Sequence, residues 1–206
     1  MSSGATVVLL DETIYCQPLL RAWIASIFLE GDSTSSAPLF VVKWTDKIMD
    51  GFVHRTMEAD PSRSATSVNK VRQHLEGTFS FGRIKKYSDV KSPEPPAPVE
   101  RHVHAAAIHG SVDYVVTMHC SDSAERIDLS YEIYSADDFL VLLDDSATST
   151  VHAVVEIELC RAHARAKAED GVDLPLLLKE AGAPEFSKRV RGHLQYVDPK
   201  ILSGDC

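Results

Sequence analysis

The sequence predicts an α/β protein with a central parallel sheet, followed by a helical extension. Two short, mostly apolar runs lie at 6–10 and 114–117 and show no alternation of polar and apolar residues. Such runs are typical of strands that a parallel sheet buries on both faces. Segments with helical periodicity lie between them, as in α/β folds, and every patterned segment after Ser146 is helical. We therefore expect an α/β domain at 1–147 and a helical extension at 148–206 that packs on it.

The helices of the first domain follow from residue spacing and capping. Between 18 and 29, apolar residues recur at the i, i+3, i+4, i+7 and i+8 positions of an amphipathic helix, and Pro18 suits its first turn. Thr45 or Asp46 can cap the next helix. The further elements expected are helices at 45–57, 65–79 and 99–109, a short strand within 127–134, and a helix capped by Asp137 or Asp138 that ends near Leu143.

The extension divides into three expected helices. The first spans 150–168, and Asp173 caps a second at 174–181, which Gly182 terminates. Pro184 opens the last helix. These helices carry apolar residues that need a buried surface, namely Leu174, Leu177, Leu178, Phe186, Val190 and Leu194.

Composition places the chain among globular proteins. Its 206 residues are 44% apolar and 25% charged, and no uninterrupted apolar stretch is long enough to cross a membrane. The four cysteines (Cys16, Cys120, Cys160 and Cys206) show no CxxC spacing, and the first residues do not resemble a signal peptide. We therefore expect free thiols, a cytoplasmic location and no membrane partner.

Charge is distributed unevenly along the chain. The formal net charge of −9 disfavours broad nucleic-acid binding. The segment 70–91, which we call the basic strip, instead holds six cations against two acidic residues. Its cations are Lys70, Arg72, Arg83, Lys85, Lys86 and Lys91. The basic strip could receive an anionic substrate, or it could be an ordinary solvated face.

Three carboxylates can gather where ligands bind to an open parallel sheet, beyond the carboxyl ends of its strands. Asp11 ends the first strand, Asp122 follows the second, and Glu100 opens the helix between them. Clustered carboxylates repel one another unless a hard cation neutralises them, and Mg²⁺ or Mn²⁺ is the natural occupant. The same residues also suit ordinary roles at strand ends, in turns and at a helix start.

Several segments, in order along the chain, resemble PIN-domain nucleases and in particular the VapC-like toxins of toxin–antitoxin pairs. Val7-Val-Leu-Leu-Asp11 with Pro18-Leu-Leu-Arg21, and Trp44-Thr-Asp-Lys-Ile48, are similar to the start of the family's fold and the lead into its second helix. Glu100-Arg-His-Val103, Tyr114-Val-Val-Thr117 and Ser135-Ala-Asp-Asp-Phe-Leu140 are similar to its later motifs. The resemblance covers nearly the whole chain.

The resemblance implies a PIN-like three-layer α/β/α fold and a toxin-type endoribonuclease that uses Mg²⁺ or Mn²⁺ to hydrolyse RNA. The implied metal residues are Asp11, Glu100 and Asp122. The implied catalytic set adds Thr117 and His119, at the end of the second strand. The implied partners are single-stranded RNA, an antitoxin protein and a second copy of the chain.

The chain departs from the family pattern within the acidic set. Where the family has a glutamate on its second helix, this chain has Gly51. Where the family has an asparagine or aspartate at the end of the second strand, this chain has His119. Glu100 stands for an aspartate, which keeps the charge and adds one methylene group. We therefore expect an eroded centre with weak or lost activity. The alternative is a non-catalytic PIN-fold module that binds RNA or protein.

The nine histidines also raise the question of a zinc site. His102 and His104 form an HxH pair, but on a helix they point in nearly opposite directions and cannot bind one ion together. His119-Cys120 offers adjacent ligands without partners. The sequence contains no Walker A, GxGxxG or GxSxG motif, so nucleotide-loop and serine-hydrolase functions lack support.

Overall fold

The computed structural model describes residues 5–34, 38–87, 94–97, 99–119, 129–165, 172–202 and 204. The chain forms two compact units, each discontinuous in sequence: unit 1 is Met1–Pro18 with Pro38–Ser135, and unit 2 is Leu19–Ala37 with Ala136–Cys206. The sequence predicted a single domain boundary, after residue 147. The grouping differs because the long helix near the start of the chain packs within unit 2, as its contacts below show.

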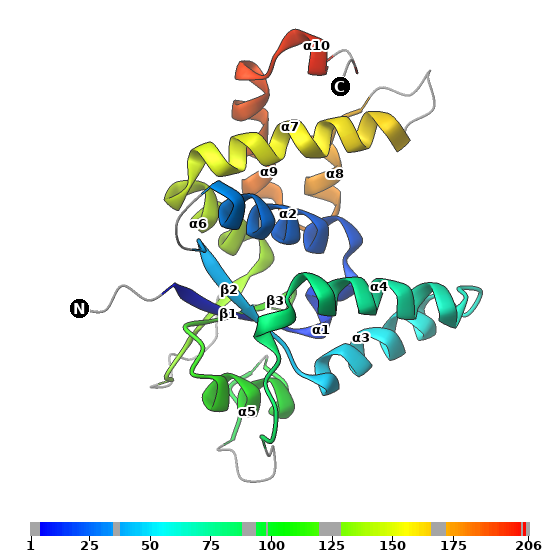
Figure 1. Cartoon of the computed structure of the whole chain (residues 1–206), viewed down its shortest axis with the longest axis vertical. Helices are drawn as coiled ribbons and strands as arrows, with labels where there is room; N and C mark the ends of the chain where they lie inside the picture. Colours follow the sequence, from blue (N-terminus) through cyan, green and yellow to red (C-terminus); the bar gives the residue numbers. More distant parts are fainter. Residues whose placement is uncertain are drawn as a thin grey trace. The chain divides into compact units, whose positions relative to one another are not determined.

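Unit 1 is built on a parallel sheet whose described strands have the order β2-β1-β3-β4. They are β1 (Thr6–Leu10), β2 (Phe40–Lys43), β3 (Tyr114–Thr117) and β4 (Glu132–Ser135). Figure 1 labels three of these strands, β1, β2 and β3. Leu9 pairs with Val115, which confirms that the two predicted buried runs are parallel neighbours. Val8, Leu9, Val115 and Val116 are fully buried, as expected for the inner strands of a parallel sheet. The α/β class and the parallel sheet are thereby confirmed.

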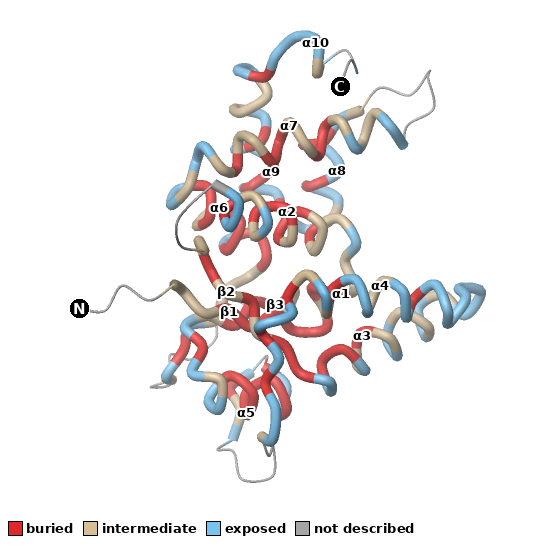
Figure 2. Tube along the Cα trace, in the orientation of Figure 1, coloured by how far each residue is buried: buried red, intermediate tan, exposed pale blue. Residues whose placement is uncertain are grey.

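The helices of unit 1 lie between β1 and β3 along the chain. They are α1 (Glu12–Cys16), α3 (Asp46–Ala59), α4 (Ala65–Thr78), the 3₁₀ turn η1 (Ser80–Gly82) and α5 (Arg101–Gly110). Thr45 caps α3 as predicted, because its hydroxyl accepts a hydrogen bond of 3.1 Å from the backbone N–H of Ile48. Figure 2 shows the central strands buried and the far turns of α3 and α4 largely exposed.

Unit 2 is helical in its described residues. It contains α2 (Pro18–Thr34, from Leu19 on), α6 (Ala136–Ser146), α7 (Thr148–Arg165), α8 (Leu174–Glu180), α9 (Pro184–His193), η2 (Leu194–Tyr196) and α10 (Pro199–Leu202). Its core joins segments far apart in sequence, since the rings of Trp23 and Phe186 meet edge to face at 5.2 Å. Ser26 on α2 also donates a hydrogen bond of 2.7 Å to Glu158 on α7. These contacts explain why α2 belongs to this unit.

Capping in unit 2 follows the sequence in part. Asp173 caps α8 by accepting a hydrogen bond of 2.9 Å from the N–H of Leu176, as predicted. Asp137 was expected to cap the helix that it begins. Its carboxylate instead accepts from the N–H groups of Glu185 and Phe186 at 2.9 and 2.8 Å, and so stabilises the start of α9.

The structure bears on three further expectations, which concern the burial of Leu177, the cysteines and membrane-spanning helices. Leu177 was expected to be buried, but it is 43% exposed and the expectation is wrong. Cys160 is disulfide-bonded, so the expectation of four free thiols, on which the cytoplasmic location partly rested, is wrong for this residue. Cys120 and Cys206 lie outside the described residues. Within the described part of the chain, none of the helices combines the length and the apolarity that a membrane span requires.

Candidate metal centre

Asp11 lies where β1 passes into α1 and holds the start of that helix. Its carboxylate oxygen Oδ1 accepts hydrogen bonds from the backbone N–H groups of Thr13 and Ile14, at 2.9 and 3.3 Å. The hydroxyl of Thr13 donates to the same oxygen and accepts from the N–H of Met118 at 3.0 Å. Asp11 therefore ties the end of β1 to the segment that follows β3.

Three potential metal ligands meet beside this turn. They are Glu12, the first residue of α1, Glu100, the N-cap residue of α5, and His102 in the first turn of α5. One ligand atom from each lies within 4.8 Å of the other two. His102 Nε2 lies 3.3 Å from Glu12 Oε2, and His102 Nδ1 lies 3.5 Å from Glu100 Oε2. We call these three residues the acidic cluster.

The side chain of Arg55, from α3, also reaches the acidic cluster. Its Nη2 atom lies 2.5 Å from Glu100 Oε1 and 3.6 Å from Glu12 Oε1. The guanidinium and the imidazole therefore each bridge the same two carboxylates. Glu12 and His102 are buried, whereas Glu100 and Arg55 are about half exposed, so the cluster is open to solvent on one side.

Gly51 faces the acidic cluster from α3. A Cβ atom at this position would lie 3.4 Å from both Cδ and Oε1 of Glu12. A longer side chain at residue 51 would therefore extend beside the Glu12 carboxylate. Its neighbour Asp50 is directed elsewhere, because it pairs with Arg72 at 2.5 Å.

Asp11 and Glu12 differ in how their surroundings shift their pKa values. Burial raises the pKa of Asp11 above its ordinary value, although the hydrogen bonds from Thr117 and Thr13 oppose the effect. Burial also disfavours the ionised form of Glu12, but the hydrogen bond and charge of His102 and the charge of Arg55 outweigh it, so the pKa of Glu12 is lowered. The surroundings therefore favour the ionised form at Glu12, the form that can bind a cation, and disfavour it at Asp11.

The structure brings together only part of the predicted site. Glu100 joins the acidic cluster, and Asp11 lies directly before Glu12 in the chain but serves as a helix cap. Thr117 is buried behind Asp11, while His119 is exposed and does not belong to the cluster found among the described residues. Asp122 lies outside the described residues.

Glu12 and Arg55 were missed from the sequence. The signal for Glu12 was the acidic pair that ends the first strand, of which we considered only the first member. His102 was correctly separated from His104: His104 Nδ1 lies 2.7 Å from the hydroxyl of Tyr131, in another part of unit 1. No sequence pattern marked Arg55, because its role depends on how α3 meets α1 and α5.

The donor set fits a divalent cation. Two carboxylates with one imidazole suit a first-row transition metal ion such as Mn²⁺ or Zn²⁺ better than Mg²⁺, which prefers oxygen ligands and near-ideal octahedral geometry. The acidic cluster could therefore hold a metal ion, although the arrangement does not specify which one. The position of Arg55 means that a metal ion would compete with a guanidinium for the same oxygens.

Comparison with known proteins yields no matching family model, curated protein or solved structure. The function must therefore be argued from the site itself.

Proposed function

We propose that this protein is a divalent-metal-dependent endoribonuclease of PIN type whose activity is weak. The observation that carries the proposal is the acidic cluster, which lies just beyond the carboxyl end of β1, the second strand in an all-parallel sheet. Ligand sites of open parallel sheets lie at this edge. The described sheet is compatible with the three-layer PIN-like fold, and the motif resemblance supports the same choice.

The proposal gives each residue a distinct task. Glu12, Glu100 and His102 would hold the metal ion, which when bound would activate water and polarise the phosphodiester. Asp11 acts as a positioning residue, because its hydrogen bonds fix the first turn of α1 and hence the direction of Glu12. Arg55 neutralises the two glutamates in the metal-free protein and must give up part of its contact on metal binding.

A second candidate is the non-catalytic module that binds RNA or protein. Two observations favour it: Arg55 already supplies a positive charge between the glutamates, and Gly51 supplies no carboxylate. In this case Arg55, Glu12 and Glu100 form an ion-pair network, with His102 beside it, that stabilises unit 1. An antitoxin partner and a homodimer remain predictions of the resemblance alone.

Metal titration separates the two candidates. Mn²⁺ is titrated calorimetrically into wild type, Glu12→Gln and the matched control Glu94→Gln, whose carboxylate is 85% exposed and pairs with Arg101. We expect one site in wild type and in the control, and its loss in Glu12→Gln. Cleavage is followed with a single-stranded RNA that carries a fluorophore and a quencher. It should require Mn²⁺ and disappear in Glu12→Gln.

The outcomes are distinct. Equal Mn²⁺ affinity in wild type and Glu12→Gln, or no binding in either, would show that no metal centre exists at the acidic cluster. Binding that depends on Glu12 without any cleavage would reject the nuclease and leave the non-catalytic module.

A further inference from the structure

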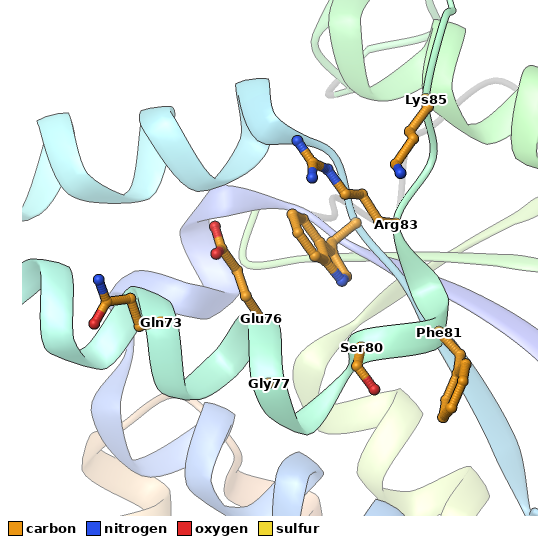
Figure 3. Close-up of a pocket in the computed structure, with 8 residues that line it drawn as sticks. Gln73, Glu76, Gly77, Ser80, Phe81, Arg83 and Lys85 are labelled. Atoms are coloured by element: carbon orange, nitrogen blue, oxygen red, sulfur yellow. The ribbon is translucent and has the colours of Figure 1, made fainter.

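An open groove in unit 1 combines aromatic, cationic and polar side chains. It has a volume of about 500 Å³ and is lined by residues of α4, η1 and the segments after β2 and η1, among them Trp44, Glu76, Phe81, Arg83 and Lys85. Figure 3 shows the side chains of Glu76 and Arg83 directed toward each other and Lys85 directed toward the segment that carries Arg83, while Phe81 points away from all three at the edge of the groove. We call this feature the aromatic groove.

Phe81 is the most exposed large apolar side chain of the described residues, at 96%. Such exposure in a phenylalanine leaves both faces of its ring available to a partner. The backbone that carries it is nevertheless fixed: Gly82 donates to Phe79 O at 2.9 Å, and Gly82 O accepts from the N–H of Trp44 at 3.1 Å. A Cβ atom at Gly82 would lie 1.8 Å from the carbonyl oxygen of Val42, so only glycine allows this close approach.

The inner wall of the aromatic groove is also rigid. The Trp44 indole is buried and donates a hydrogen bond of 2.8 Å to Phe79 O. The guanidinium of Arg83 lies 5.6 Å from the centre of the Trp44 ring, a cation–π distance, and pairs with Asp46 at 2.6 Å. A ligand would therefore meet a preformed surface, which lowers the entropy cost of binding.

Positive charge continues beyond the aromatic groove. An adjoining pocket of about 300 Å³ is lined by Asp46, Lys47, Ile84, Lys85, Lys86 and Tyr87. Together the two pockets present four cations against two carboxylates, in a chain whose net charge is −9. Among the described residues, Lys85 and Lys86 have no ion-pair partner and both are exposed. Of the rest of the basic strip, Arg72 is paired with Asp50 and Glu76, and Lys91 lies outside the described residues.

We propose that the aromatic groove binds single-stranded RNA, with one base stacked on Phe81 and neighbouring phosphates in contact with Lys85 and Lys86. Exposed aromatic platforms beside cations bind single strands in this way, since every base has a face that can stack. Exposed, unpaired lysines favour a polyanion over a protein partner, because protein interfaces are depleted in lysine.

The location of the aromatic groove fits the proposed nuclease. Trp44 follows directly after β2, which pairs in parallel with β1, so the groove and the acidic cluster belong to the same edge of one sheet. The choice of RNA as the ligand rests on the proposed function. The groove itself rests on independent observations, so the two can be tested apart.

Binding is measured by fluorescence anisotropy with a short labelled single-stranded RNA in EDTA, which removes any dependence on metal or cleavage. We expect Phe81→Ala to weaken binding roughly tenfold or more, and Phe81→Trp to retain it. The matched control is Tyr196→Ala, which removes an aromatic side chain that is 80% exposed on unit 2 and should leave binding unchanged. Thermal melts of each variant establish that it is folded.

Salt dependence tests the cationic part. Replacing Lys85 and Lys86 with glutamine should weaken binding and reduce the slope of log K against log salt by about 0.7 for each lost phosphate contact. Equal RNA affinity in wild type and Phe81→Ala would overturn the proposal and leave the aromatic groove to a protein partner. Tighter binding of a single-stranded DNA than of the RNA, measured in the same way, would also overturn the proposal. Phe81-dependent RNA binding in a protein that fails the Mn²⁺ test would sustain the groove while rejecting the nuclease.

Discussion

Replacing Arg55 with glutamine removes the cation that bridges Glu12 and Glu100. Taking one partner from a buried ion pair costs about 3–5 kcal/mol. Here the side chain of Glu12 is 4% exposed but that of Arg55 is 42% exposed, so solvent screens the contact. His102 also remains beside Glu12. We therefore expect Arg55→Gln to lower the free energy of unfolding in EDTA by about 1–2 kcal/mol, or about 2–8 °C in melting temperature.

Added metal should reverse this loss. Mn²⁺ at a hundred times its dissociation constant would stabilise the folded protein by about 2.7 kcal/mol. Because the glutamine no longer competes for the carboxylates, Arg55→Gln should bind Mn²⁺ more tightly than wild type and gain more melting temperature from it. Differential scanning fluorimetry in EDTA and in a Mn²⁺ series measures both effects.

The matched control is Arg63→Gln, which removes a guanidinium 3.4 Å from Asp60 at a site where both side chains are about half exposed. It should change the melting temperature little under either condition. If Arg55→Gln is destabilised in EDTA and Mn²⁺ restores no more than it adds to wild type, then Arg55 and the two glutamates are an ion-pair network and the metal centre is refuted.

Three other perturbations probe the same unit. In urea unfolding, Gly82→Ala should destabilise the protein by about 2 kcal/mol or more, because the new Cβ would meet the Val42 carbonyl. Gly77→Ala has open space around its Cβ and should be neutral or stabilising by about 0.5–1 kcal/mol. Similar effects at both positions would contradict the packing of η1. The lowered pKa of Glu12 contributes stability that is present above its ordinary pKa of 4.5 and is lost as pH falls through the lower folded value. Glu12→Gln should therefore reduce the loss of stability at acid pH, measured as the free energy of unfolding against pH. An unchanged acid dependence would count against the pairing of Glu12 with His102 and Arg55. Gly51→Glu should melt lower than wild type in EDTA, since it adds a carboxylate beside Glu12, and should bind Mn²⁺ more tightly by calorimetry; unaltered affinity would show that residue 51 does not face a metal site.

The sequence predicted the two inner strands and a short strand that overlaps the edge strand β4, but not the other edge strand, β2. The runs that became β1 and β3 are buried on both faces, and this leaves a continuous apolar signature. β2 has only four residues, with alternating burial, and ends next to the Thr45 cap, so no separate signal marked it. The cap formed by Asp137 was assigned to the wrong helix for a related reason, because local capping rules consider only residues adjacent in the chain.

The candidate site, like the fold, was predicted only in part. The rule that ligands gather at strand ends selected Asp11, yet the backbone turns there, and Asp11 is used as a cap while the next residue points to α3 and α5. A one-residue shift of this kind depends on the conformation of the turn. Arg55 enters only through tertiary packing between helices whose contact no periodicity reveals.

The interleaving of the two units has a consequence for how the chain is made. Because Trp23 on α2 packs against Phe186 on α9, more than three quarters of the sequence must be synthesised before the core of unit 2 can close. Until α9 has been synthesised, the apolar face of α2 has no partner to cover it, and exposed apolar surface of this kind favours chaperone binding or aggregation. A nonsense mutation near the end of the coding region would therefore leave α2 uncovered, and we expect such truncated chains to be degraded even when every residue of unit 1 is present.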